Sequence, residues 1–287
     1  MTKRAQLKDN LHTLEDIGNI MTAMKNLCSI ELSKMTKFLS MQDKAMQTIN
    51  DVKSDFISAY PLIPTLHQDA KPLIYILIGS ERGFCGGFNN NVLVELERLK
   101  EQNPNPALIV VGRKLALKLA DDSHVTHVLD GPNVIEEIPA VILTVLKVLE
   151  EVTLQKHSDL HLGQWNIIFN EEKQDQIEIT TLQPFEEFFI ASADNFSVPP
   201  VINLSNDLFL AELIENYLFS MFHSVFYKSF FIENHQRLVH LNNSLDRLDS
   251  KRSALKGHLK LIRQEEITEE IQIIMLSAEA IIGKDVI

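Results

Sequence analysis

One stretch near the end of the chain, residues 238–262, reads LVHLNNSLDRLDSKRSALKGHLKLI. Apolar residues recur in it at alternating steps of three and four, which is the spacing of a coiled-coil seam. The seam positions are Leu238, Leu241, Leu245, Leu248, Leu255, Leu259 and Ile262, and Arg252 interrupts the series. The stretch therefore predicts a helix that packs along its length against a partner helix.

This helix is expected to extend well beyond the quoted stretch. Residues 201–287 contain no proline and only two glycines, Gly257 and Gly283. About 75 helical residues would span roughly 110 Å, several times the diameter of a small domain. After Ile262 the apolar positions slip by one residue, so the partner surface must change or the coil must rewind locally. The resumed positions are Ile267, Ile271, Ile274, Ala278 and Ile281.

The other end of the chain offers a partner for this seam. Residues 1–60 lack proline, and Gly18 is their only glycine. Alternate steps of four and three from Leu7 to Ile49 give 13 positions, of which ten are apolar. We therefore expect an antiparallel coiled coil formed by the two termini, with an α/β domain inserted between its helices. Two ordinary amphipathic helices packed on that domain are the alternative.

Composition and length describe a globular chain. Its 287 residues are 45% apolar, which is enough for one or two domains with a real core. No run of about eighteen apolar residues is present, and the N-terminal MTKRAQLKDNLHTLED lacks the apolar core of a signal peptide. Cys28 and Cys85 do not have the spacing of a zinc site or a disulfide framework. These features predict a cytosolic, bacterial protein with reduced thiols, and no metal.

Charge is distributed unevenly along the chain. Residues 58–206 hold ten basic and twenty acidic side chains, whereas the two ends are nearly balanced. An acidic middle domain argues against nucleic acid as a partner. On the C-terminal helix, Arg252, Lys256, Lys260 and Arg263 form one basic stripe. Such a stripe is either a solvated face or a docking face for an acidic partner.

Between the two ends, short apolar runs rich in β-branched residues alternate with helical patterns. Strands are expected at 73–78, 107–111, 125–129, 165–169 and 177–182, and helices at about 92–99, 112–120 and 135–157. This alternation is typical of an α/β layer. Pro61, Pro64 and Pro72 indicate a linker before the domain, and residues 195–200 are expected to close it. The expected division is a coiled-coil helix over 1–60, an α/β domain over 70–198 and a second coiled-coil helix over 205–287.

The loop GSERGFCGGFN, residues 79–89, follows the first expected strand and precedes a helix, which is where phosphates often bind. It contains neither GxGxxG nor GxxxxGK[ST], so we expect no nucleotide or other cofactor. Gly83, Gly86 and Gly87 are expected to form a tight turn around Cys85, with glycine used for positive φ. Cys85 as a nucleophile would need a nearby base that the sequence does not indicate. A small buried thiol is the preferred interpretation.

Three stretches, in order, resemble the gamma subunit of the rotary F-type ATP synthase. IMTAMK (20–25) is similar to the family's I-T-K-A-M-K, and the loop 79–89 to S-D-R-G-L-C-G-G-x-N. In the C-terminal helix, Glu233, Asn234 and Arg237 match S-E-N-x-x-R-M, and RQEEITEEI (263–271) matches R-Q-A-A-I-T-x-E-I. The resemblance covers the whole chain.

This resemblance implies a central shaft that turns inside a hexamer of alpha and beta subunits, while its globular foot rests on a membrane-embedded c-ring and meets an epsilon subunit. It implies a peripheral protein at the cytoplasmic face of the bacterial inner membrane, with no active site of its own. It also implies that Met24, Lys25, Arg263, Gln264 and Thr268 contact the hexamer, with the last three opposite the first two. A rigid two-helix shaft would pass torque and couple distant sites.

The sequence departs from the family pattern at several positions. CSIEL (28–32) stands where the family has A-A-S-K-M, so that Glu31 replaces a basic residue. Glu265 and Glu266 replace two alanines, and Ser277 a late glycine. These departures indicate a divergent branch or an alternative operon, and they leave the charge contacts of the shaft open. A generic coiled-coil adaptor and a small-molecule enzyme on the α/β domain are the competing functions.

Overall fold

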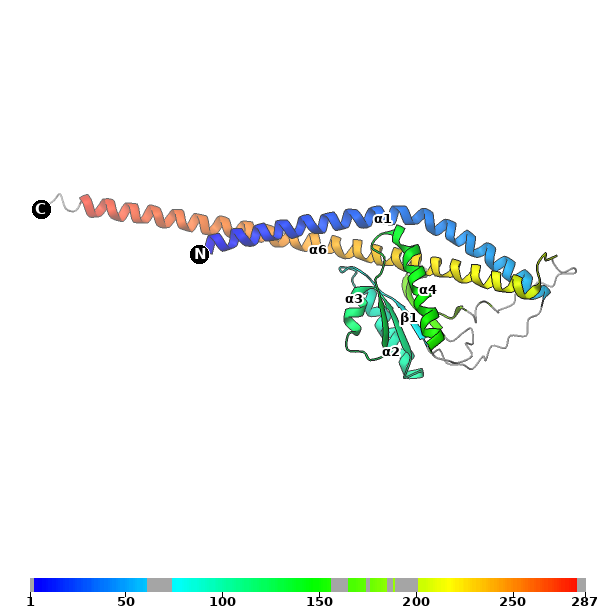
Figure 1. Ribbon diagram of the computed structural model, residues 1–287. Coiled ribbons are helices and arrows are strands. Elements are labelled where there is room, and N and C mark those ends of the chain that lie inside the picture. The colour runs from blue at the N-terminus through cyan, green and yellow to red at the C-terminus, as the bar shows by residue number, and fades with distance from the viewer. Residues whose placement is uncertain are drawn as a thin grey trace. The chain divides into compact units, whose positions relative to one another are not determined.

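The computed structural model describes residues 3–60, 74–155, 165–173, 176–184, 188 and 201–282. The expected linker at 61–72 and the expected domain end at 195–200 lie outside these ranges. By order along the chain, the helices and strands are α1 (Lys3–Ala59), β1 (Ile74–Ile78), α2 (Phe88–Gln102), β2 (Ala107–Val111), α3 (Arg113–Ala116), η1 (Leu117–Leu119), β3 (Val125–Leu129), η2 (Ile135–Glu137), α4 (Ile138–Gln155), β4 (Trp165–Lys173), β5 (Gln176–Leu182) and α6 (Asn206–Ile282) (Figure 1).

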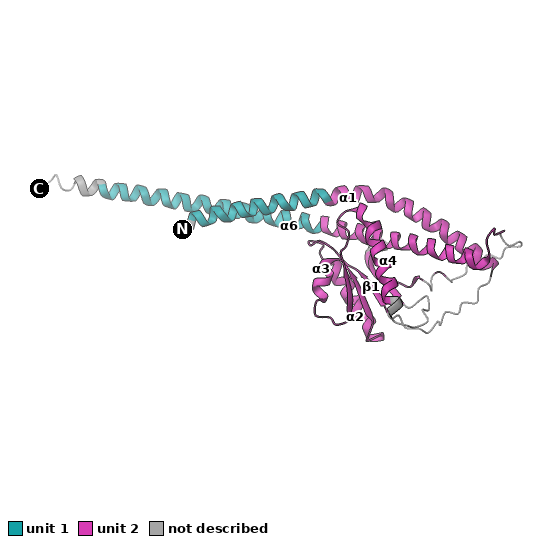
Figure 2. Ribbon diagram, in the orientation of Figure 1, with its two compact units in different colours: residues 1–27, 239–287 teal, residues 28–238 magenta. Residues whose placement is uncertain are grey.

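The chain divides into two compact units, coloured separately in Figure 2. Unit 1 comprises residues 1–27 and 239–287, and unit 2 comprises residues 28–238. Helices α1 and α6 each run through both units. The helix α1 ends at Ala59 because the residue before Pro61 is disfavoured in a helical conformation.

In unit 1 the two helices run antiparallel. Arg4 pairs with Glu266 at 2.9 Å between side-chain nitrogen and oxygen, and Glu15 with Lys256 at 3.6 Å. A Cβ on Gly18 would lie 3.4 Å from the Leu248 side chain. The seam positions of residues 238–262 are all buried or half-buried. The coiled-coil prediction for this stretch is confirmed.

The helices are also antiparallel in unit 2. The rings of Phe38 and Tyr227 stack with centroids 5.9 Å apart, and those of Phe56 and Phe209 lie 4.9 Å apart. Gln42 on α1 donates from its side-chain amide to the carbonyl oxygen of Ser220 on α6 at 2.8 Å. Large apolar and aromatic side chains therefore hold α1 and α6 together in this unit.

Unit 2 also contains one five-stranded sheet in the order β3-β2-β1-β4-β5. The strand β1 pairs in parallel with β2 and β4, β2 pairs in parallel with β3, and β4 pairs antiparallel with β5. The strand β4 extends to Lys173, beyond the predicted end at residue 169, because β5 supplies it with an antiparallel partner through Lys173 and Gln176. The sheet is thus mixed, and α2 and α4 lie on its opposite sides (Figure 1).

Each face of the sheet buries its own apolar cluster. One face packs Ile76, Ile109 and Ile167 against α4 and against α1 and α6 side chains that include Met35 and Phe222. The residues of the other face pack against α2 and α3, and they are Tyr75, Leu77, Leu108, Val110 and Ile168. Alternate residues of buried parallel strands point to opposite faces, so these strands are apolar on both sides. The α/β fold between two long helices is as predicted.

Candidate partner-binding surfaces

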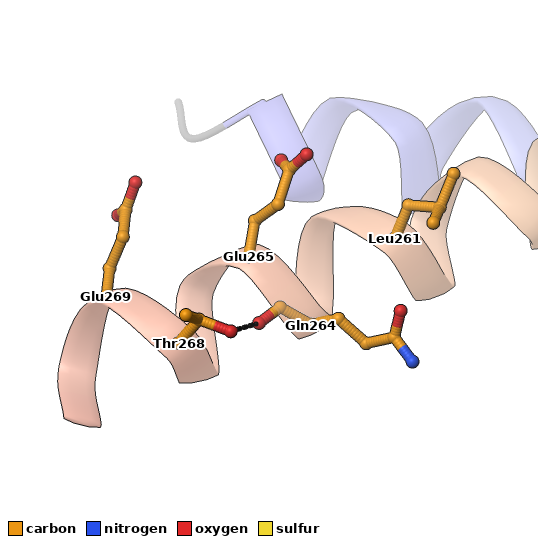
Figure 3. Close-up of a pocket in the computed structure, with 5 residues that line it drawn as sticks. All are labelled: Leu261, Gln264, Glu265, Thr268 and Glu269. Carbon is orange, nitrogen blue, oxygen red and sulfur yellow. Dashed lines mark hydrogen bonds between the residues drawn. The ribbon is translucent and has the colours of Figure 1, made fainter. Parts of the chain in front are cut away.

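The first candidate surface is the exposed part of α6 in unit 1 around Arg263, Gln264 and Thr268. All three side chains are exposed. The Thr268 hydroxyl donates to the carbonyl oxygen of Gln264 at 2.8 Å, which places both residues on one face of the helix. A shallow hollow of about 300 Å³ lies beside them, lined by Leu261, Gln264, Glu265, Thr268 and Glu269. Figure 3 shows Glu265 pointing toward the first turns of α1, whereas the Gln264 side chain extends away from α1.

The basic stripe leading to Arg263 is partly neutralised within unit 1. Arg252 lies 3.7 Å from Asp249, and Lys256 lies 3.6 Å from Glu15. Among the described residues, neither Lys260 nor Arg263 has a carboxylate within ion-pair distance. Lys260 and Arg263, the two residues of the stripe nearest the end of α6, therefore keep their charge available for a partner.

Met24 and Lys25 do not lie opposite this surface, so that part of the prediction is wrong. The contacts of Arg4 with Glu266 and of Gly18 with Leu248 set the register of the two helices. Because the helices are antiparallel, residues that follow Gly18 on α1, such as Met24 and Lys25, lie beside residues that precede Leu248 on α6. Arg263 lies more than about 20 Å further along α6, at 1.5 Å per residue. Sequence motifs mark positions on each helix, but the register follows from how the two seams interlock.

The loop between β1 and α2 forms the turn that the glycine pattern predicted, although with a different use of glycine. Gly86 has φ of +57°, and the non-glycine Phe84 has φ of +63°. Gly83 and Gly87 have ordinary backbone conformations, and a Cβ on Gly83 would approach nothing closer than the Lys114 side chain at 3.9 Å. Positive φ is thus needed at one of the three predicted glycines.

Cys85 is a buried thiol inside this turn. It is 6% exposed and its Sγ donates to the Ser80 hydroxyl oxygen at 3.2 Å. Burial raises the pKa of the Cys85 thiol, while the Ser80 hydroxyl opposes this effect. A neutral buried thiol is a poor nucleophile. The geometry agrees with a structural thiol.

Buried asparagine side chains form hydrogen bonds near the point where the sheet reverses its strand order, between the carboxyl ends of β1 and β4. Open α/β sheets often bind ligands at such a point. Asn89 accepts from the Ser80 backbone N–H at 2.9 Å and donates to the Ser80 hydroxyl at 2.8 Å. Asn170 on β4 donates to the carbonyl oxygen of Phe88 at 3.1 Å. These internal hydrogen bonds fix the loop at this point of the sheet.

The motif residues Glu233, Asn234 and Arg237 lie under this same loop and are all less than 5% exposed. Arg237 donates from Nε to the carbonyl oxygen of Gly83 at 3.0 Å and from Nη2 to that of Arg82 at 3.2 Å. It also pairs with Glu233 on its own helix. Arg237 therefore binds the domain's own loop, and Glu233 and Asn234 hold its side chain in place.

Sequence reasoning missed the role of Glu31, which it recorded as a departure from a family pattern. Glu31 is 7% exposed, and its Oε2 accepts from the backbone N–H of Ile135 at 2.9 Å. Its Oε1 accepts from Lys34 at 3.0 Å, and Lys34 also reaches Glu136 at 2.9 Å. The i,i+3 spacing of Glu31 and Lys34 was the available signal, but it did not reveal the distant backbone partner.

Two kinds of site are not found in the part of the chain that the structure describes. No group of three or more His, Cys, Asp or Glu side chains there is arranged to hold a metal ion. No helix within the described ranges has the length and apolar character needed to cross a bilayer. In unit 2 two antiparallel helices carry an α/β domain, and in unit 1 the end of α6 bears a basic stripe and exposed apolar side chains. Exposed apolar surface of this kind is typical of the class of proteins that bind other proteins.

Comparison with protein families gives this class a family. The ATP synthase family model matches residues 3–281, so the chain belongs to that family. The chain is 24% identical to the ATP synthase gamma chain of Azobacteroides pseudotrichonymphae, over 98% of this chain and all of that one. It is 26% identical over 218 residues to the ATP synthase gamma chain of Clostridium botulinum strain Langeland, which covers 72% of each.

Solved structures with a similar fold come from the same kind of assembly. The rotor of Euglena gracilis mitochondrial ATP synthase matches with a TM-score of 0.59 and 16% identity, over 92% of this chain and 98% of that one. The central stalk and c-ring structure of Tetrahymena thermophila mitochondrial ATP synthase matches with a TM-score of 0.53 and 16% identity, over 78% and 99%. The predicted family and fold are confirmed.

Proposed function

We propose that this chain is the central rotor shaft, the gamma subunit, of an F-type ATP synthase. In that role it couples ion flow through a membrane ring to ATP synthesis or hydrolysis in a catalytic hexamer. The observation that carries the proposal is the antiparallel pairing of α1 and α6, which recurs from Arg4 and Glu266 in unit 1 to Phe56 and Phe209 in unit 2. Within each unit the paired seam resists bending, because bending exposes apolar area at about 25 cal/mol per Å².

The exposed apolar side chains in the last described turns of α6 favour a partner protein that covers them. The pair of Arg4 and Glu266 marks where the described part of α1 begins, so positions further along α6 have no α1 residue beside them within the described chain. Large apolar side chains there are 45–66% exposed, and they are Ile267, Ile271, Ile273, Ile274, Met275 and Leu276. An apolar patch of this kind is typical of a protein interface. We assign it to the alpha and beta subunits of the hexamer.

The α/β domain is proposed to meet an epsilon subunit and the loops of the c-ring. Its excess of acidic side chains, twenty against ten over residues 58–206, favours contacts made by charges at the rim. Association at this end should therefore weaken with added salt. The chain would lie at the cytoplasmic face of the bacterial inner membrane as a peripheral subunit.

The proposal is tested by asking whether ATP-driven ion pumping depends on this chain. In a strain that lacks the chain, inverted membrane vesicles should show no ATP-driven ion pumping, and a plasmid-borne tagged copy should restore it. The tagged copy should also co-purify with the nucleotide-binding subunits. If pumping persists without the chain and those subunits do not co-purify, a generic coiled-coil adaptor becomes the better function.

A further inference from the structure

We infer that two buried charged residues, Arg237 on α6 and Glu31 on α1, form a joint that fixes the α/β domain to both long helices and passes torque to it. Both residues reach the domain through its backbone groups, and each is also paired with an oppositely charged side chain on its own helix. The inference rests on the proposed function, because torque acts on this joint only if the chain turns as a rotor.

Arg237 forms the α6 half of the joint. Its guanidinium group is directed at two consecutive carbonyl oxygens, those of Arg82 and Gly83, at 3.2 and 3.0 Å. Nη1 donates to the Asn234 amide oxygen at 3.1 Å, and Nη2 pairs with Glu233, so the group is also fixed on its own helix. Burial opposes its charge, but Glu233 outweighs burial and raises the pKa of Arg237. A planar fork of donors can make all these bonds at once, which a lysine ammonium cannot.

Glu31 forms the α1 half with the opposite charge. Its carboxylate accepts the Ile135 N–H at 2.9 Å, at the first residue of η2, which leads directly into α4. The first N–H groups of a helical segment lack internal partners and favour a negative charge. Lys34 holds the other carboxylate oxygen at 3.0 Å, which fixes the orientation of Glu31.

Glu81 and Arg82 connect the two halves at one edge of the sheet. The Glu81 side chain is 5% exposed, and its Oε2 accepts from the backbone N–H groups of Gly131 at 2.8 Å and Arg113 at 3.1 Å. Arg82 donates from Nε to the Asn133 amide oxygen at 2.9 Å. The loops that follow β1, β2 and β3 are thereby tied together. Force applied at either contact is therefore shared among the loops that follow β1, β2 and β3.

Directional contacts matter here because much of the remaining packing of the domain on α1 and α6 is apolar, although Lys228 on α6 also pairs with Glu171 on β4 at 3.8 Å. Met35, Phe222 and Phe226 contribute to the cluster on that face of the sheet. Apolar burial favours contact but is not directional. Hydrogen bonds from a charged group depend strongly on distance and angle, so they resist rolling and sliding of the helices. The opposite charges at two helices give the joint two fixed points.

The test uses the assembled complex with Arg237→Lys, Glu31→Gln and both changes together. Controls are Arg98→Lys and Glu97→Gln, which alter two ion pairs at the surface of α2 and leave both joint contacts in place. Subunit content and thermal midpoint establish assembly for every variant. The measured quantity is the number of ions pumped per ATP hydrolysed.

In the double variant, ions pumped per ATP should fall about 2- to 30-fold, the range expected when a residue of a coupling network changes. ATP hydrolysis should stay within about two-fold of the wild type, because slippage occurs after the hexamer has turned the helices. The controls should match the wild type. In Glu31→Ala, which removes the acceptor, the Ile135 amide proton should exchange about ten-fold faster or more.

The inference is overturned if the assembled double variant pumps as many ions per ATP as the wild type. It is also overturned if hydrolysis and pumping fall in proportion, because the residues would then act at the hexamer. Failure of the proposed function gives a different result, namely no pumping that depends on the wild-type chain. Should Arg237→Lys fail to assemble, the Glu31→Gln and Glu31→Ala complexes provide the same comparison.

Discussion

Glu233 and Arg237 lie one helical turn apart on α6 and form an ion pair whose side chains are only 4% and 5% exposed. Burial raises the pKa of the Glu233 carboxyl, whereas the guanidinium beside it lowers that pKa. A buried ion pair contributes little net stability, but a single buried charge without its partner is costly. We therefore interpret the role of Glu233 as balancing the charge of Arg237, which allows Arg237 to be buried next to the β1–α2 loop.

The first prediction follows from this asymmetry. Arg237→Met should lower the free energy of unfolding by about 3 to 5 kcal/mol, because it leaves the Glu233 charge buried and unpaired. Adding Glu233→Leu should recover a large part of this loss. Urea unfolding of the isolated chain measures both variants, and equal losses in the single and double variants would contradict the explanation.

The second prediction concerns the glycines of the β1–α2 loop. Gly86→Ala should destabilise the chain by about 1 to 2 kcal/mol, since φ of +57° brings a Cβ into steric conflict with the backbone. Gly83→Ala is the matched control in the same loop, where an added Cβ meets only the end of Lys114 at 3.9 Å. Its effect should remain within about 0.5 kcal/mol. Urea unfolding that shows equal effects would remove the assigned role of Gly86.

Much of the fold could be predicted because it depends on local patterns. Leu241, Leu248 and Ile262 occupy seam positions of the quoted stretch and are all buried. The parallel strands were visible as short apolar runs, because burial on both faces leaves no room for polar alternation. Strand β4 was underestimated because its second half contains Asn170 and Glu171 and depends on pairing with β5.

The contacts of the site could be predicted less well, because they join residues far apart in sequence. Glu31 and Ile135 are 104 positions apart, and no periodicity connects them. The register that separates Lys25 from Arg263 likewise depends on how two seams interlock over their length. Phe84 has a positive φ although it is not a glycine. An argument that looks for positive φ only at glycines cannot find it.

The third prediction is that Cys85 is structural. Burial raises the pKa of both Cys85 and Cys28. Both thiols of the native chain should therefore react with iodoacetamide at pH 8 at no more than about one tenth of their rate in urea. Cys85→Ser should leave ATP hydrolysis by the assembled complex within a few-fold of normal. Complete loss of hydrolysis in a folded and incorporated variant would require a chemical role for the thiol.

The fourth prediction is a pH-dependent contribution of Asp122. Burial disfavours its charge, but hydrogen bonds from Lys100 and His124 outweigh burial and lower its pKa from 3.8 to about 2. Since the folded pKa is below the unfolded one, the contribution is complete above about pH 4 and is lost as the pH falls toward 2. Asp122→Asn should therefore cost about 2 kcal/mol at pH 7 and distinctly less at pH 3. Urea unfolding at the two pH values measures this, and a cost independent of pH would exclude the mechanism.

The fifth prediction places the main grip of the shaft on the hexamer at Arg263, Gln264 and Thr268. Arg263 and Gln264 are exposed hydrogen-bond donors, and Thr268 lies on the same face as Gln264, with its hydroxyl 2.8 Å from the Gln264 carbonyl oxygen. The charge of Glu266 is partly balanced by Arg4 at 2.9 Å, whereas Glu265 lines the hollow beside the grip. An acidic partner loop that binds at Arg263 would thus also meet the negative side chains of Glu265 and Glu269, which line the hollow.

Complexes with Arg263→Ala, Gln264→Ala and Thr268→Ala together should lose about ten-fold or more of both ATP hydrolysis and ATP-driven pumping, because charge-assisted hydrogen bonds contribute about 1.5 to 3 kcal/mol each. The control combines Asn243→Ala, Arg247→Ala and Ser250→Ala, three exposed residues about five turns earlier on α6, in which Ser250 repeats the hydroxyl contact to the preceding turn. The control complex should retain both activities. Wild-type activity in the assembled first variant would place the grip elsewhere on the shaft, and an equal loss in both variants would show that helix stability, and not the grip, had been changed.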